Sequence, residues 1–277
     1  MADNPADADL IELGTKTPLG PYLKEMWDRR EFAIVVPAND IRAQNMDTFL
    51  GQLWHLLNPL MLIGVYYIIF GVVLKTSRGV ENFLGFLVVG ILIFQLSQRA
   101  IQEAAASIRR NESLIRSIQF PRSLLPVSAV TGQTIAFIPS LVVLLSFVLI
   151  TGERPTLRWF LLPVILLGQA LFGVGASFII ARIGFAVTDI QQILPHLFRL
   201  LFYMSGVIFS VEVFITNTTM QNLFALNPMY DIITAARWAL MGLPLPVACV
   251  VGLVLWALLL PIAGLLFFRA REHRYGA

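Results

Sequence analysis

Hydrophobic and polar positions divide most of the chain into long uncharged runs separated by short charged segments. A helix needs about 20 apolar residues to cross about 30 Å of hydrocarbon. Runs near that length predict six transmembrane helices, at Leu56–Leu74, Val80–Arg99, within Ser123–Gly152, Trp159–Ala181, Ile190–Val211 and from Val247 within Trp238–Phe268. Pro126 and Pro139 are expected to kink the third helix. The pattern predicts an all-α integral membrane protein with a transmembrane domain at residues 56–268.

The chain before the first run has a different pattern. Residues 1–17 are polar and acidic, without a signal-peptide pattern, and predict a disordered cytoplasmic tail. From Leu19 to Glu31 the apolar positions recur at helical spacing and place five side chains on one face: Leu19, Tyr22, Leu23, Met26 and Trp27. This stretch is too charged to span a bilayer but suited to lie on one. We therefore expect an amphipathic interface segment at residues 18–55 and, after the last span, a basic cytoplasmic tail at 269–277.

Two connections between the predicted spans are longer than a turn requires. Residues 99–122 have helical character that is interrupted at Asn111–Glu112–Ser113, which predicts a short cytoplasmic coupling helix after the break. Residues 212–245 mix apolar and polar positions in pieces too short to span. Because unpaired backbone is not tolerated in lipid, we expect external re-entrant or interfacial helices there, before the last span.

Composition and charge agree with a chain that lipid covers. The chain is 57% hydrophobic and 13% charged, with a mean hydropathy of +0.76, whereas soluble domains are about 25% charged. With the N-terminus inside, fourteen Lys and Arg residues fall on cytoplasmic segments and five on external ones. This distribution follows the positive-inside rule and predicts a multi-pass protein of a bacterial inner membrane with both termini cytoplasmic.

Sequence motifs for enzymatic chemistry are absent. The sequence has no G-x-x-x-x-G-K-[ST] phosphate loop, no G-x-S-x-G and no H-E-x-x-H. Cys249 is the one cysteine, and the three histidines do not pair with it in a metal-binding spacing. Intramembrane Asp/Glu pairs that carry protons or sodium ions are missing. We expect no catalytic residue, no metal site, no cofactor and no nucleic-acid partner for this chain.

A few residues in the spans are candidates for substrate contact. Arg199 falls inside the fifth predicted span, where a charge costs at least about 2.5–3.5 kcal/mol and should face protein, water or an anionic ligand. It could contact an anionic substrate or be a snorkelling or packing arginine, and both readings stay open. The aromatic residues Tyr66, Tyr67 and Phe70 fit either an interfacial belt or a lining on which sugars stack.

Several motifs occur in an ordered series along the chain. The first is Asp40-Ile41-Arg42 with Phe49–Trp54 and Asn58-Pro59-Leu60. Further along come Phe120-Pro121-Arg122 within Asn111–Val127, Asp189-Ile190 before Pro195, Ser205–Ile208, Leu226–Met229 and Arg237–Leu240. In this order the series resembles ABC-2 type permeases that export polysaccharides, from about Asp40 to the C-terminus. Asn39 and Thr188 depart from it, since arginine is usual at both positions.

The resemblance implies a half-transporter, a homodimer joined to two copies of a separate subunit that binds ATP and Mg. The implied cargo is a polysaccharide on a polyprenyl diphosphate carrier, such as an O-antigen, a teichoic acid or, as the arginine-rich composition favours, a cell-wall galactan. Contact with the ATP-binding subunit is implied for Asn111, Glu112, Ile115, Phe120, Pro121 and Arg122. Candidate diphosphate contacts are Arg29, Arg30 and Arg42. The external segment that would help close the outer mouth includes Asn227, Pro228, Asp231 and Arg237.

Two other functions compete with polysaccharide export. An ABC-2 exporter of a drug or lipid shares the six-span plan. A membrane-bound glycosyl-carrier enzyme is the third alternative, but the cytoplasmic loops lack the acidic cluster that metal-assisted sugar-phosphate chemistry needs.

Overall fold

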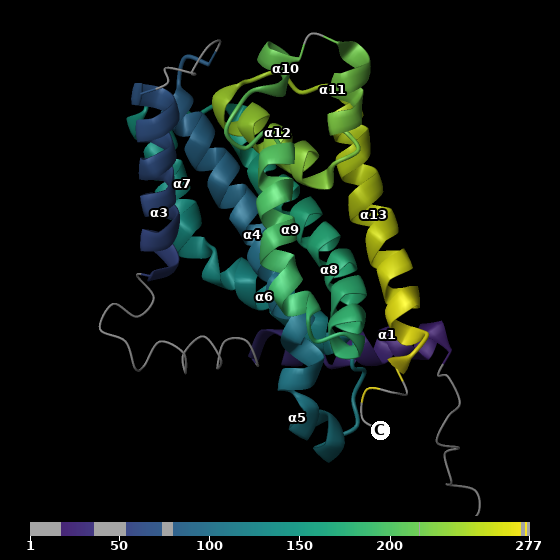
Figure 1. Cartoon of the computed structure of the whole chain (residues 1–277). Coiled ribbons are helices and arrows are strands. Elements are labelled where there is room, and N and C mark those ends of the chain that lie inside the picture. Colours follow the sequence, from purple (N-terminus) through teal and green to yellow (C-terminus); the bar gives the residue numbers. More distant parts are fainter. Residues whose placement is uncertain (1–17, 36–53, 74–79, 216, 273–274, 276–277) are drawn as a thin grey trace, which may run out of the picture.

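The computed structural model describes residues 18–35, 54–73, 80–215, 217–272 and 275. Every regular element in this part of the chain is a helix, in agreement with the predicted all-α fold (Figure 1). The predicted tail at 1–17 and the part of the predicted interface segment at 36–53 lie outside the described residues.

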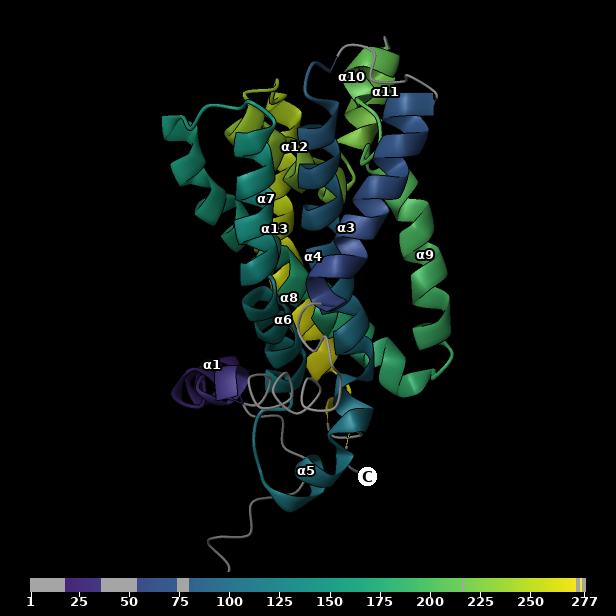
Figure 2. The ribbon, with the colours of Figure 1, turned by 90° about the vertical axis from the view of Figure 1, so that its left-hand side faces the viewer.

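From α4 onward the elements follow one another with short connections. In chain order they are α1 (Leu19–Asp28), α3 (Trp54–Tyr66), the π-helix η3 (Tyr67–Val73), α4 (Phe83–Arg110), α5 (Glu112–Ser117), α6 (Leu124–Ala136), α7 (Ile138–Ile150), the 3₁₀ turn η4 (Leu157–Leu161), α8 (Leu162–Ala186), α9 (Ile190–Met204), α10 (Val211–Phe214), α11 (Thr218–Phe224), α12 (Pro228–Met241) and α13 (Val247–Arg269). The long helices form a bundle, with α1 and α5 at one end, called the α5 end below, and α10 to α12 at the other, called the α12 end (Figures 1 and 2).

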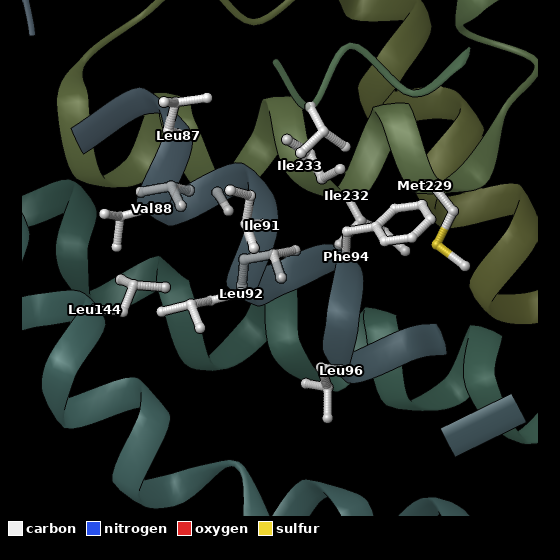
Figure 3. Packing of buried hydrophobic residues seen from close by; sticks show 14 of the residues in the cluster. Leu87, Val88, Ile91, Leu92, Phe94, Leu96, Leu144, Met229, Ile232 and Ile233 are labelled. Atoms are coloured by element: carbon white, nitrogen blue, oxygen red, sulfur yellow. The ribbon is translucent and has the colours of Figure 1, made fainter. Parts of the chain in front are cut away.

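Helix α4 is the centre of the bundle. It packs against α3, α6, α7, α8, α9 and α12. Leu87, Val88 and Ile91 of α4 are completely buried, and Figure 3 shows them beside Ile232 and Ile233 of α12. An α-helix that is apolar on all sides is stable only where neighbours cover every face, and the first half of α4 has that composition.

Helices α8 and α13 approach each other most closely where both carry glycine. A Cβ atom on Gly175 of α8 would overlap the backbone of Leu260 and Pro261, and one on Gly264 of α13 would overlap the Gly175 carbonyl. Small residues of this kind let helix backbones come into direct van der Waals contact, which is the main attraction between helices in lipid.

Three helices are long and apolar enough to cross a membrane: α4, α8 together with η4, and α13. Helices α6 and α7 form a fourth candidate, bent by 41° at the residue between them. Helix α3 with η3, and helix α9, run alongside the bundle but fall short of the same test. The described chain is therefore an all-helical bundle with three or four candidate spans, and the count of six stays a prediction.

Helix α4 continues past Arg99 to Arg110 and ends at the predicted break, so the helical character expected after the second span is confirmed. Two other expectations were wrong. Pro126 does not kink its helix, since it sits in the first turn of α6, where the missing N–H has no helical acceptor. Pro139 lies at the bend, as predicted. Helix α9 ends at Met204 rather than near Val211, since Gly206 has a positive φ of 60° that turns the chain.

Candidate functional site

Helix α5 projects from the α5 end beyond the rest of the bundle (Figures 1 and 2). Asn111 separates it from α4, and its side-chain amide donates to the Ser107 carbonyl at 2.8 Å, which satisfies an acceptor in the last turn of α4. Ile115 points inward and belongs to a buried cluster with Ile108 and Leu125. The sequence thus located this break correctly, and one apolar side chain attaches the short helix to the bundle.

The outward side of α5 is polar and exposed. Glu112 and Arg116, one helical turn apart, form an ion pair of 2.5 Å, and Ser113 and Ser117 lie exposed beside them. Such surface pairs contribute only about 0.3–0.5 kcal/mol to helix stability. The face is therefore suited to contact with another polar surface rather than with lipid.

The loop after α5 is covered by the residues that follow α1. The rings of Phe32 and Phe120 lie 5.0 Å apart, and Arg29 donates to the Gln119 carbonyl at 2.6 Å. Pro121 is buried at the same place. The predicted coupling residues and one predicted substrate contact, Arg29, therefore meet in a single contact region, where Arg29 binds protein backbone.

The C-terminal residues also reach this region. Glu272 Oε1 accepts one hydrogen bond of 2.8 Å from the Tyr22 hydroxyl and another of 3.0 Å from the Arg122 backbone N–H. The Arg122 guanidinium donates to the Glu272 carbonyl, and the Tyr22 hydroxyl shares a further hydrogen bond of 2.7 Å with the hydroxyl of Ser123. The guanidinium of Arg269 lies 4.2 Å from the centre of the Tyr22 ring.

Burial dominates the electrostatics of this network. It raises the pKa of the Glu272 carboxyl, although the Tyr22 hydroxyl, the Arg122 N–H and the charges of Arg269 and Arg122 favour the ionised form. Burial, reinforced by the negative charge of Glu272, likewise raises the pKa of Tyr22. We predicted 269–277 as a basic tail, yet Glu272 and Tyr275 are folded into the protein, and Tyr275 is 2% exposed. The only local signal for the contacts of Glu272 was that it is one acidic residue among arginines.

The other side of α1 carries an exposed apolar row. Leu19, Leu23 and Trp27, spaced four residues apart, are 45%, 49% and 68% exposed. Arg30 lies over the Trp27 ring at 5.2 Å and donates to the Trp27 carbonyl at 3.1 Å. Tyr22 and Met26 of the same predicted face instead turn toward the protein. Helix α1 therefore has one side fixed to the bundle and one apolar side open to a lipid surface.

At the α12 end, α12 begins within the Leu226–Met229 motif. The Asn227 side chain caps the helix by accepting from the Met229 N–H at 3.0 Å, and Pro228 takes the first helical position. The same Asn227 donates to Ser205 Oγ at 2.9 Å, which ties α12 to the turn after α9. Asp231 is completely buried on the next turn, against Gly252 of α13.

Arg237 of α12 is buried. It is 4% exposed and donates to the carbonyls of Gly206 at 2.8 Å, Val207 at 2.7 Å and Phe86 at 3.1 and 3.3 Å. Its guanidinium also lies 3.3 Å from the centre of the Phe86 ring. We predicted Arg237 in the external segment at residues 212–245. The structure adds that its side chain connects α12, the turn after α9 and α4 through backbone carbonyls, partners that leave no pattern in the sequence.

The remaining predicted substrate contacts separate into two places. Tyr66 stacks on Phe202 of α9 at 5.6 Å and lies 5.9 Å from Phe70. Tyr67 lies apart from that group, in η3 beside a hollow at the α12 end.

Arg199 is exposed and sits in the second half of α9, away from the α5 end. For the side chain of Arg199 to snorkel, it would have to extend from this position toward the α5 end. Arg29 and Arg30 directly follow α1, which lies at the α5 end of the bundle (Figure 1), and Arg42 lies outside the described residues.

An apolar helical bundle with a polar helix protruding at one end is the architecture of a membrane permease. The chain belongs to the ABC-2 type transporter family, because the sequence model of that family matches residues 38–241. It is similar to the O-antigen export system permease protein RfbA of Myxococcus xanthus, 29% identical over 213 residues that cover 77% of this chain and 81% of that protein. A Klebsiella pneumoniae protein of the same name is 25% identical over 246 residues, 88% of this chain and 93% of the relative. The predicted family is thereby confirmed.

Proposed function

We propose that this chain is the membrane-spanning subunit of an ATP-driven exporter that moves a polysaccharide, linked to a polyprenyl diphosphate, across a bacterial inner membrane. The observation that carries the proposal is similarity, over 77% and 88% of the chain, to two O-antigen export permeases. A separate partner subunit binds ATP and Mg and hydrolyses the ATP. Two copies of each chain form the transporter.

Six spans and cytoplasmic termini complete the topology. Helix α3 and η3 run without a break from Trp54 to Val73, about 30 Å at 1.5 Å per residue, which is enough to cross the hydrocarbon. Helix α9 with the turn at Gly206 supplies the fifth crossing. The α5 end is cytoplasmic, because the predicted cytoplasmic segments carry fourteen of the basic residues.

The partner subunit docks on α5 and the loop that follows it. The exposed polar face of α5 projects past the bundle and is therefore accessible to a protein on the cytoplasmic side of the membrane. Asn111, Phe120, Pro121 and Arg122 hold that face in place through their contacts with α4, α1 and the C-terminal residues. Movement of the partner subunit is passed to α4 and α6 as rigid bodies.

The cargo meets charged and aromatic groups on its path. Arg30 and Arg42, with Arg29, attract the diphosphate at the cytoplasmic rim. The group of Tyr66, Phe70 and Arg199 between α3 and α9, with Tyr67 further along, contacts the glycan chain. The exported glycan is a cell-wall galactan on this proposal.

Closure of the external mouth depends on α12. Asn227 and Pro228 fix where α12 starts, and Arg237 fixes its other half against α4 and the turn after α9. Asp231 lies between, against α13. The external helices therefore move as one unit with the ends of three spans.

Depletion of the chain in its host, followed by location of the lipid-linked glycan, tests the function. Accumulation of full-length glycan in the cytoplasm supports export. Loss of the polymer points to the glycosyl-carrier enzyme instead. Unchanged glycan together with loss of export of a small amphiphile points to the drug or lipid exporter.

A further inference from the structure

Glu272 stands where three separate elements meet at the α5 end. Its carboxylate accepts from Tyr22 of α1 at 2.8 Å and from the backbone N–H of Arg122, in the loop after α5, at 3.0 Å. Its own carbonyl accepts from the Arg122 guanidinium. Three residues earlier the chain is still helix α13, so these contacts join α13 to both α1 and the loop.

Neighbouring contacts make this junction rigid. Tyr275 packs with its ring 4.8 Å from that of Phe268 and donates to the Phe268 carbonyl at 3.0 Å, which folds the chain back onto the end of α13. Arg182 of α8 donates to the Phe267 carbonyl, so the last turn of α13 is held from a second side. The residues around Glu272 therefore form a fixed connection rather than a loose end.

Helix α13 leads from this junction to the opposite end of the bundle. It has 23 residues, about 35 Å, and packs against α8 along its length and against α12 at the far end. There Gly252 of α13 lies so close to Asp231 of α12 that a Cβ atom would overlap its carboxylate. A displacement of α13 along its axis would therefore push directly against α12 at this contact.

We propose that Glu272 is a positioning residue that fixes the coupling loop to the end of α13, so that movement of α5 reaches α12 through α13. The chain already connects α5 to α4 and α6, and the junction at Glu272 adds a second route. The statement about transmission rests on the proposed function, because it needs an ATP-binding subunit to drive α5. The statement about anchoring does not.

Hydrogen–deuterium exchange of the full chain in lipid nanodiscs tests the anchoring without any partner subunit. Glu272→Ala removes the oxygen that accepts both hydrogen bonds. We expect roughly tenfold faster exchange in residues 19–28 and 118–123, the factor that loss of two hydrogen bonds gives. Glu272→Gln keeps an acceptor oxygen at the same place and should match the wild type. The exposed neighbour Arg271→Ala is the control. Unchanged exchange in Glu272→Ala overturns the anchoring.

Glycan exported per ATP hydrolysed, measured on the reconstituted complex, tests the transmission. We expect Glu272→Ala to lower this ratio roughly fivefold while hydrolysis continues, with Glu272→Gln and Arg271→Ala at the wild-type ratio. If Glu272→Ala does not assemble, Tyr22→Phe, which removes one of the hydrogen bonds, takes its place. A ratio unchanged in the variant overturns the second route. A wild-type chain that binds no ATP-binding subunit overturns the proposed function instead and leaves the exchange result standing.

Discussion

Replacement of Arg237 by alanine would remove the contact that holds the α12 end together. The guanidinium donates four hydrogen bonds to three backbone carbonyls, and its plane lies on the Phe86 ring. The Phe86 carbonyl lies inside α4 and keeps a helical partner, but those of Gly206 and Val207 belong to a turn between helices and would lose theirs.

The magnitude follows from these contacts. Each buried acceptor left unsatisfied costs about 1–3 kcal/mol, and a desolvated cation–π contact contributes about 2 kcal/mol. Removal of a buried charge recovers part of its desolvation cost, which offsets some of the loss. We expect a net destabilisation of about 3 kcal/mol, which for a chain of this size lowers the melting temperature by about 6–12 °C.

Thermal unfolding of the purified protein in one detergent measures the effect. Arg158→Ala is the matched control, because Arg158 is exposed and its main contact is the Trp238 ring at 5.3 Å, worth about 0.5–1 kcal/mol. Arg237→Lys keeps the charge but lacks the planar fork, and should fall between the two. If Arg237→Ala lowers the melting temperature no more than Arg158→Ala does, the assignment of Arg237 as the central connection of this end is wrong.

Further changes probe the other contacts. Gly90→Ala places a Cβ against the Arg237 guanidinium, so the melting temperature should fall. In the Gly90→Ala/Arg237→Ala double variant it should fall by less than the sum of the two single effects, whereas full additivity would argue against contact. Gly264→Val should separate α13 from α8 at Gly175 and reduce both melting temperature and export, whereas a tolerated valine would mean that the helices are not in backbone contact. Because the pKa of Glu272 is raised in the folded protein, the folded state holds its proton more tightly. The melting temperature should therefore decrease as the pH rises through that pKa, and Glu272→Gln should lack this part of the pH dependence; identical profiles would contradict it.

Local signals in the sequence were enough to place several elements. The break at Asn111 and the start of α13 at Val247 were both expected, since a polar interruption and a long apolar run act within a few residues. Family membership was also accessible, because it depends on an ordered series of short motifs.

Other features depend on partners far away in the chain. Arg237 was predicted in the external segment at residues 212–245, and its acceptors are carbonyls 30 to 151 residues away, which no local pattern indicates. Glu272 was predicted in the basic tail at 269–277, although its partners Tyr22 and Arg122 lie 250 and 150 residues from it. A backbone carbonyl has no identity in a sequence, so contacts of this kind become visible only in the folded structure.

On the proposed function, this chain is the membrane half of an ATP-driven glycan exporter. The direct measurement is the ATPase activity of the chain co-purified with an ATP-binding subunit from the same organism, in proteoliposomes with and without the lipid-linked glycan. We predict a stable complex in which the glycan stimulates hydrolysis and appears on the far side of the membrane. A chain that purifies alone and associates with no ATP-binding subunit would contradict the half-transporter and would favour the membrane-enzyme alternative.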